Sequence, residues 1–356
     1  MTAFAIFATA TELQAATPDP LQFIMTDPAF CLCPGLFRHL TRADVDVPIE
    51  LRIAYQHGDT CLRVRGPLLG GFDLAILQAV EMVAATSKAV VTPSAGIHAE
   101  LIAGLDSADA LDDEQADEPL VFHGVGADDE LLYASCSISH LLSTVGLPLN
   151  SHYTKLAAES LEHLSAVTIF MSPKDAPSRF QTLRLLSRCK VGANKRSSVV
   201  HFALHPRLTA ALLNRGGRQD TRLCAEELQA LGVEHEARVL HQRLCALIND
   251  GTMRPLTVAS LVEYLFPEDV SGMALAKVHG RDAKALYDVK QRKLEVVSKA
   301  LGVLCSKLSW TVKARGSRAL ALETTVEISR PSKEWTHSKL RAAAARQREE
   351  QLAIAA

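Results

Sequence analysis

Residues 131–164 read LLYASCSISHLLSTVGLPLNSHYTKLAAESLEHL. Residues 131–136 predict a short strand, and Ser137 is suited to cap a helix that reaches Val145. Gly146-Leu147-Pro148 then predicts a turn, after which Asn150 or Ser151 caps a second helix that ends near residue 164. Two helices joined by a short turn that contains glycine have the spacing of a helix-turn-helix.

The flanking sequence supplies the other elements of such a unit. Residues 72–85 place apolar side chains on one helical stripe, and residues 167–171, 183–191 and 198–204 predict strands. Further toward the N-terminus, residues 49–55 and 60–65 alternate apolar and polar side chains around His57-Gly58-Asp59, which indicates a hairpin.

The same order of elements occurs a second time in the sequence. Residues 234–248 predict a helix, residues 253–256 an extended segment, and Thr257 caps a helix over residues 258–266. A glycine-containing loop leads to a long helix at 283–304, and strands at 309–314 and 319–328 are joined around Arg315-Gly316-Ser317. The repeated pattern predicts an α+β fold of two tandem winged-helix domains, rich in helix.

We therefore expect four regions along the chain. Residues 1–26 are expected to be a flexible tail, and residues 27–215 a first winged-helix domain with an N-terminal hairpin and an acidic insertion near 98–130. Residues 216–330 are expected to form the second winged-helix domain. The Ala-, Arg-, Glu- and Gln-rich residues 331–356 predict a basic helical tail.

The charge is distributed unevenly. The 356 residues carry a net charge of −2, which taken alone argues against a polyanion-binding protein. Residues 1–154, however, contain 6 basic and 20 acidic side chains, whereas residues 155–356 contain 32 basic and 20 acidic ones. Such asymmetry indicates a polyanionic partner for the second half. Eleven of the acidic residues fall within 100–130, a stretch that predicts a solvated loop, a partner contact or a DNA mimic.

The sequence offers no support for an enzyme, a metal or a cofactor. It lacks a Gly-Lys-Ser/Thr phosphate loop, a complete dinucleotide fingerprint, an H-E-x-x-H zinc motif and a G-x-S-x-G elbow. Cys31 and Cys33 form a lone C-x-C, and most of the eight cysteines lie in apolar stretches, as buried free thiols do. No stretch has the composition of a bilayer span or of a secretory signal, so a cytoplasmic protein is expected.

In the first predicted unit, the second helix of the helix-turn-helix begins with Asn150, Ser151, His152 and Lys155. Short polar side chains at a helix N-terminus suit a major groove or a phosphate, although an ordinary capped helix is the alternative. Arg188, Lys190, Lys195 and Arg196 fall on the predicted wing. A basic wing pairs with backbone phosphates, and a solvated hairpin tip is the alternative there.

In the second unit, the long helix places Lys284, Tyr287, Lys290, Gln291 and Lys293 among its polar positions, where they could read base edges or contact phosphates. Lys313, Arg315 and Arg318 bracket the second wing. These two sets of residues are the predicted DNA-binding residues.

Several segments carry a recognisable pattern: DPAFCLCPGLFR at 27–38, AYQHGD at 54–59 with GPL at 66–68, LAILQ at 74–78 and EARVLHQRLC at 236–245. In composition and order these segments resemble the RepC family, the replication initiators of IncQ-type broad-host-range plasmids. The first 26 residues, residues 98–130, residues 271–282 and the tail after Pro331 look like additions to the family pattern.

The resemblance implies a protein without enzymatic activity that binds iterons, the direct repeats of a plasmid origin, as double-stranded DNA. It also implies opening of an AT-rich segment and cooperation with a plasmid-encoded helicase and primase. The balance between monomer and homodimer stays open. Two other functions fit the pattern: a tandem winged-helix transcriptional regulator, and an interaction module that binds a helicase but not DNA.

Overall fold

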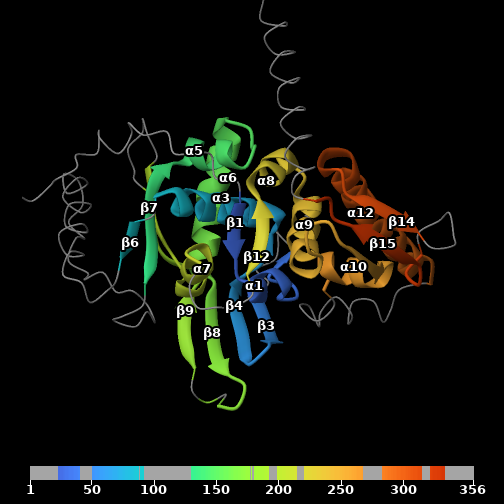
Figure 1. The fold of residues 1–356 in the computed structure, drawn as a ribbon, viewed down its shortest axis with the longest axis horizontal. Helices are drawn as coiled ribbons and strands as arrows, with labels where there is room; N and C mark the ends of the chain where they lie inside the picture. Colours follow the sequence, from blue (N-terminus) through green and yellow to red (C-terminus); the bar gives the residue numbers. More distant parts are fainter. Residues whose placement is uncertain are drawn as a thin grey trace, which may run out of the picture.

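The computed structural model describes residues 23–40, 50–87, 89–91, 130–176, 178, 180–191, 199–214, 220–267, 283–314 and 321–332. The structure combines helices with several small sheets (Figure 1). The mixed α+β class predicted from the sequence is confirmed. Among the described helices, none combines the length and hydrophobicity that a bilayer crossing requires.

The first unit contains a helix, a strand, two helices and two strands in chain order. They are α3 (Gly71–Ser87), β7 (Leu131–Ser137), α5 (Ile138–Thr144), α6 (Ser151–Ala166), β10 (Leu186–Val191) and β11 (Val199–Leu204). Their antiparallel sheet has the order β10-β11-β7-β6, where β6 is Ala89–Val91. The strand before helices α5 and α6 therefore pairs with the last strand of the unit.

The second unit repeats this arrangement. It consists of α9 (His235–Leu247), β13 (Met253–Thr257), α10 (Val258–Leu265), α12 (Ala283–Leu308), β14 (Thr311–Ala314) and β15 (Thr325–Ser329). The sheet order β13-β15-β14 again pairs the strand before the two helices with the last strand. The two units thus share both the order of elements and the order of strands.

The predicted caps form where the sequence placed them. Ser137 accepts a hydrogen bond from His140 N at 3.1 Å, and Asn150 accepts one from Tyr153 N at 3.0 Å. Thr257 accepts one from Ser260 N at 3.2 Å. Each bond satisfies one of the amide groups that a helix start leaves unpaired. In the turn between α5 and α6, Gly146 has φ of +71°, a conformation that glycine adopts without strain.

A separate four-stranded sheet interrupts the first unit. It contains β3 (Glu50–His57), β4 (Thr60–Pro67), β8 (Thr168–Pro173) and β9 (Gln181–Arg184), in that spatial order. The single strand predicted at 183–191 is wrong, because the chain breaks at Leu185 into β9 and β10, which join different sheets. Buried Leu185 donates its amide to Val167 O at 3.2 Å, which turns the chain between the two sheets.

Several short helices and strands that the sequence did not predict precede and follow the first unit. These are β1 (Phe23–Thr26), α1 (Pro28–Leu32), β2 (Phe37–Arg38), β5 (Leu69–Gly70), α7 (Pro206–Leu212), β12 (Thr221–Cys224) and α8 (Ala225–Leu231). Strand β1 pairs with β12, and Ile24 is buried. Residues 23–26 therefore do not belong to the flexible tail expected for residues 1–26, because pairing and burial of an apolar side chain order them.

Helix α9, the first helix of the second unit, is buried on almost every side. Its apolar residues Ala237, Leu240 and Leu244 are buried, and so are Arg238 and His241 on its polar face. It packs against α3 and α1 of the N-terminal part and against α10 and α12 of the second unit. One hydrophobic core runs through both units as a result.

Four predicted features lie outside the described residues. They are residues 1–22 of the N-terminal tail, residues 98–129 of the acidic insertion, the loop at 271–282 and residues 333–356 of the C-terminal tail.

Candidate nucleic-acid interface

The start of α6 presents the polar side chains that the sequence singled out. Ser151 and His152 are exposed, and the Asn150 side-chain oxygen is engaged in the cap, where it accepts from Tyr153 N. Lys155 is 79% exposed, with its Nζ 3.6 Å from Glu159 Oε1 one turn later. No described helix or strand therefore covers these side chains, and the N-terminal turn of α6 could contact a phosphate or a base edge.

The rest of the α6 surface is less basic than the charge of the second half suggested. Glu159 is partly exposed, and Glu162 is exposed on the same helix. These two carboxylates offset the charge of Lys155. Any polyanion contact of α6 is consequently confined to its first turns.

The first predicted wing is described only in its strands. Arg188 lies opposite Ala203, and Lys190 lies opposite His201, in the pairing of β10 with β11. Lys195 and Arg196 fall between these strands, outside the described residues. The strand pairing shows that β10 and β11 are neighbouring antiparallel strands, as a wing requires.

Helix α12 carries the second set. Lys290 is exposed, Gln291 is half-buried, and Lys293 Nζ lies 5.4 Å from the centroid of the Phe266 ring. Lys284 and Tyr287 lie in the first two turns of the same helix. The position of Lys293 over an aromatic ring indicates that part of its charge is used in packing within the protein.

Further basic residues extend the exposed side of α12. Arg292 and Lys299 are exposed, and Lys307 Nζ lies 3.1 Å from Glu234 Oε1. Glu295 is the exposed carboxylate among the described side chains of this helix. The described surface of α12 is therefore clearly basic, in contrast to that of α6.

The second wing is partly described. Lys313 is exposed on β14, directly opposite Glu327 of β15. Arg315 and Arg318 lie between these strands, outside the described residues.

The two predicted sets lie on different units. In the view of Figure 1, α8 separates α6 from α12. Helix α8 packs against α12, and its Gln229 O approaches the turn before α6 so closely that a Cβ on Gly146 would lie 2.2 Å away. The two sets thus lie on separate helices, with α8 between them in this view.

A third basic surface, which the sequence patterns above did not predict, lies on the sheet of β3, β4, β8 and β9. Arg52, Arg63, Arg65 and Arg184 lie on it, together with Phe170 and Phe180. The signal was available in the predicted hairpin, where Arg63 and Arg65 alternate with buried Leu62 and Val64.

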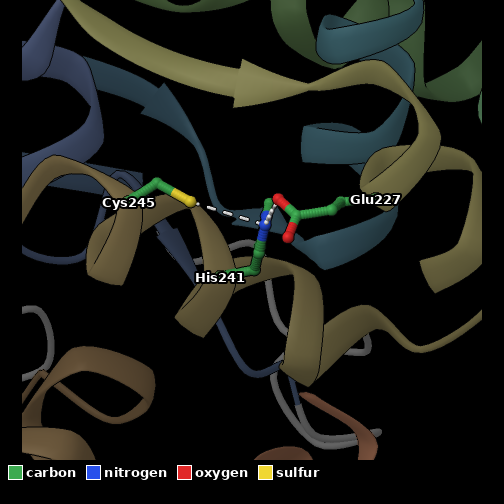
Figure 2. A group of neighbouring side chains, drawn as sticks. All are labelled: Glu227, His241 and Cys245. Carbon is green, nitrogen blue, oxygen red and sulfur yellow. Dashed lines mark hydrogen bonds and ion pairs between the residues drawn. The ribbon is translucent and has the colours of Figure 1, made fainter. Parts of the chain in front are cut away.

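One cluster has the residue types of a metal site. Figure 2 shows Glu227, His241 and Cys245 converging, and their potential ligand atoms lie within 4.8 Å of one another. His241 Nε2 lies 2.9 Å from Glu227 Oε2 and 3.4 Å from Cys245 Sγ. All three side chains are buried.

The three side chains of this cluster contact one another inside the core. Burial raises the pKa of Cys245 well above its ordinary value, so its thiol is protonated. Burial also raises the pKa of Glu227, but the charge and hydrogen bond of His241, the charge of Arg330 and the hydrogen bond from Trp310 together outweigh this effect, and the pKa is lowered overall. Trp310 Nε1 donates to Glu227 Oε1 at 3.3 Å, which occupies the second oxygen.

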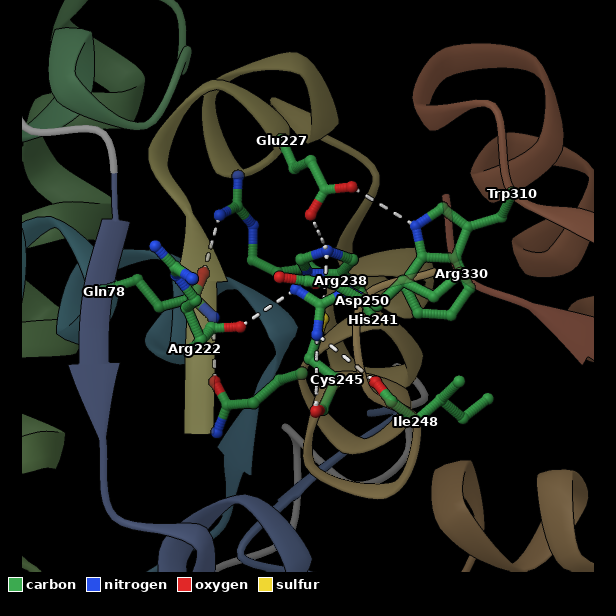
Figure 3. Close-up of polar contacts among 11 residues, drawn as sticks. Gln78, Arg222, Glu227, Arg238, His241, Cys245, Ile248, Asp250, Trp310 and Arg330 are labelled. Carbon is green, nitrogen blue, oxygen red and sulfur yellow. Dashed lines mark hydrogen bonds and ion pairs between the residues drawn. The ribbon is translucent and has the colours of Figure 1, made fainter. Parts of the chain in front are cut away.

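The cluster belongs to a wider network of buried polar groups between the units (Figure 3). Arg330 Nε pairs with Asp250 Oδ1 at 2.9 Å, and its NH groups donate to Ile248 O at 3.3 Å and to Arg222 O at 3.0 Å. Arg238 donates to Gln78 Oε1 at 2.8 Å. The network contacts α3, β12, α8, α9 and the end of β15, and it fixes these elements relative to one another.

One family model matches the greater part of the chain. Residues 19–303 match the family model of Replication protein C (RepC). No curated protein sequence matches the chain. A crystal structure of selenomethionine derivatives of domains 2 and 3 of RctB shares 10% identity at a TM-score of 0.46, covering 86% of this chain and 99% of that chain. A second crystal structure of RctB domains 2-3 shares 10% identity at a TM-score of 0.45, covering 85% and 96%. Because the family model spans most of its residues, the chain belongs to the RepC family of replication proteins.

Proposed function

We propose that this protein is a replication initiator of a plasmid of the IncQ type, which binds iterons in the origin as double-stranded DNA. In this proposal residues 27–215 and 216–330 form two winged-helix domains. The observation that carries it is the repeated topology: in both units the strand before a helix pair is joined to the last strand of a terminal hairpin. That topology supports a winged helix in each unit.

The second unit provides the stronger DNA contact in this proposal. Helix α12 lies in a major groove, with Lys284, Lys290 and Arg292 on phosphates and Tyr287 or Gln291 at base edges. The exposed Lys290 and Arg292 and the half-buried Gln291 support these roles, because phosphate contacts require accessible charge and base readout requires a positioned amide. Lys313, Arg315 and Arg318 contact the backbone from the wing.

The first unit reads an adjacent groove through Asn150, Ser151, His152 and Lys155, with its wing residues Arg188, Lys190, Lys195 and Arg196 on phosphates. The weaker positive charge of α6 indicates that this unit contributes more to register than to affinity. Binding then distorts an AT-rich segment, and the plasmid's helicase and primase follow. No covalent reaction is assigned to the protein.

The direct test is binding of purified protein to a labelled duplex with the origin repeats, over a range of salt concentrations. The double variant Lys284→Ala, Lys290→Ala should bind the duplex at least about 10-fold more weakly. The slope of log affinity against log salt concentration should fall by about 2, since each phosphate contact contributes about 0.9. The matched control is Lys299→Ala with Lys307→Ala, which removes two lysines from the C-terminal half of the same helix. Equal losses for both pairs would show that α12 acts through general charge and not as a reading helix.

Two other functions are separated by a second measurement. Permanganate footprinting of a supercoiled origin detects unpaired thymines, which an initiator produces and a transcriptional regulator does not. If the protein only recruits a helicase, the repeats are not bound specifically, and the Lys284→Ala, Lys290→Ala variant behaves as the wild type.

A further inference from the structure

The sheet of β3, β4, β8 and β9 has one apolar face and one face in solvent. On the inner face Leu51, Leu62, Val64, Ile169 and Leu183 are buried. Because side chains alternate along a strand, the residues between them point to the opposite side. In Figure 1 the hairpins β3–β4 and β8–β9 extend away from the helices, at the lower end of the molecule.

The outer face carries four arginines close together. Arg52 lies directly opposite Arg65, which lies opposite Thr168, which in turn lies opposite Arg184. Arg63 lies two residues before Arg65 in β4, so its side chain is on the same face of the sheet. Like charges directly opposite one another destabilise a sheet, so folding alone does not favour this arrangement.

Little of this charge is neutralised within the protein. Arg52 pairs with Glu50 at 2.6 Å while its side chain is 74% exposed. Within the part of the chain that the structure describes, Arg63, Arg65 and Arg184 form no ion pair with a carboxylate. The face therefore presents guanidinium groups that can bind phosphates.

Two phenylalanines lie among these arginines. Phe170 packs edge-to-face against Phe180 with 5.9 Å between ring centroids, and Phe180 is 52% exposed. The Arg63 guanidinium lies 5.8 Å from the Phe170 centroid and 5.5 Å from that of Phe180, and Arg65 lies 5.6 Å from Phe170. These contacts place the rings and the guanidinium planes on the same face, where both types of group can stack on a flat ligand.

We propose that this outer face, defined by Arg52, Arg63, Arg65, Arg184, Phe170 and Phe180, binds single-stranded DNA. Unpaired bases expose the faces that stack on aromatic rings and guanidinium planes, whereas a duplex hides them. Phosphates neutralise the row of arginines. Four strands span about 14 Å, enough for a few nucleotides across the face.

The charge of this face disfavours a second copy of the chain or an apolar partner as its ligand. A second copy of this face would bring arginine against arginine in a two-fold contact. An apolar partner would leave the guanidinium groups unpaired as they lose water. A polyanion with flat apolar groups matches both features of the face.

This inference rests on the proposed function only for the source of the strand, which is the origin segment opened on binding. It assigns to the same chain a second nucleic-acid surface, separate from α6 and α12. Such a surface would hold one strand of the opened segment while the repeats stay bound.

The test is fluorescence anisotropy of the full chain with labelled oligo-dT of roughly 20 nucleotides, beside the duplex with the repeats. The double variant Arg63→Ala, Phe180→Ala should bind oligo-dT at least about 10-fold more weakly, and its binding of the duplex should be unchanged. The matched control is Met253→Ala with Arg254→Ala, which removes an exposed apolar side chain and an exposed arginine from β13. This control should bind both DNAs as the wild type does.

Circular dichroism checks that the variants fold. A further variant, Phe180→Leu, removes the aromatic ring but keeps an apolar side chain at this half-exposed site, and it should still lose affinity for oligo-dT. The proposal is overturned if the wild type does not bind oligo-dT, if both variants bind it normally, or if oligo-rU binds more tightly. It is also overturned if sedimentation shows that the Phe180 variants dissociate a dimer. Loss of duplex binding alone in the Lys284→Ala, Lys290→Ala variant leaves this inference intact and separates the two surfaces.

Discussion

Arg238 offers the sharpest test of how the two units are joined. Its side chain is fully buried, and its NH groups donate to Gln78 Oε1 at 2.8 Å, Val145 O at 3.2 Å, Leu228 O at 2.9 Å and Gly232 O at 3.1 Å. Val145 is the C-cap of α5, and Gly232 is the C-cap of α8. One guanidinium from α9 therefore satisfies carbonyl groups that two other helices leave unpaired at their ends.

The cost of removing this group follows from those contacts. Burial lowers the pKa of Arg238 to about 9, so the side chain is still charged at neutral pH. Replacing Arg238→Met keeps much of the volume but leaves four acceptors without a donor, and each unsatisfied buried group costs about 1–3 kcal/mol. Relief from burying a charge offsets part of this loss. We expect a net decrease of about 3–5 kcal/mol in the free energy of unfolding, as for other broken buried polar contacts.

Urea unfolding monitored by circular dichroism and tryptophan fluorescence measures this change, since Trp310 is buried beside the network. The control is Arg254→Met, because Arg254 is exposed and, among the described residues, its guanidinium donates to Leu247 O alone, at 3.1 Å. It should change stability by less than about 1 kcal/mol. If Arg238→Met does not fold, Arg238→Lys keeps the charge with fewer donors and should give an intermediate loss. A loss below about 1 kcal/mol for Arg238→Met would refute the reasoning, because the four bonds would then be replaceable by water.

Three further predictions concern single side chains. Burial raises the pKa of Glu81 to about 8; the stability that its proton provides is present below about pH 4.5 and is lost as pH rises through 8. Glu81→Gln should therefore remove this loss and be the more stable protein at pH 9, by up to about 4 kcal/mol in urea titrations at several pH values. Gly146→Ala should lower the free energy of unfolding by more than about 1 kcal/mol, because φ is +71° and the new Cβ would lie 2.2 Å from Gln229 O. A lower midpoint of thermal unfolding measures this loss. Trp310→Phe should lose about 1 kcal/mol by urea unfolding, because it removes the hydrogen bond to Glu227, whereas an unchanged midpoint would assign that bond no net effect.

Local patterns in the sequence predicted most helices and strands of the two units. Caps at Ser137, Asn150 and Thr257 and the turn at Gly146 depend on residues within a few positions of one another, so the sequence alone contains the signal. The long helix α12 follows likewise from its apolar stripe, although it reaches Leu308 and not 304.

The sequence could not predict contacts made over long separations. Arg238 and His241 look like the solvent face of an amphipathic helix, and their partners Gln78 and Glu227 lie far away in sequence or in an unpredicted helix. The break at Leu185 is also invisible, because both sides of it have the composition of a strand. Whether the predicted DNA-binding residues bind DNA stays a prediction, although the exposure of Lys155, Lys290 and Lys313 is consistent with it.

The shared core bears on how an initiator of this kind could distort DNA. Strand β1 pairs with β12, His39 of the N-terminal part pairs with Glu236 of α9 at 2.9 Å, and Arg238 joins the turn before α6 to the end of α8. Helix α8 in turn packs on α12. These contacts fix the two proposed reading helices at one mutual orientation, so binding both grooves leaves little freedom between the units. For the proposed function, the DNA must then bend or untwist to fit the protein, and flexible AT-rich steps lower the energy that this deformation requires.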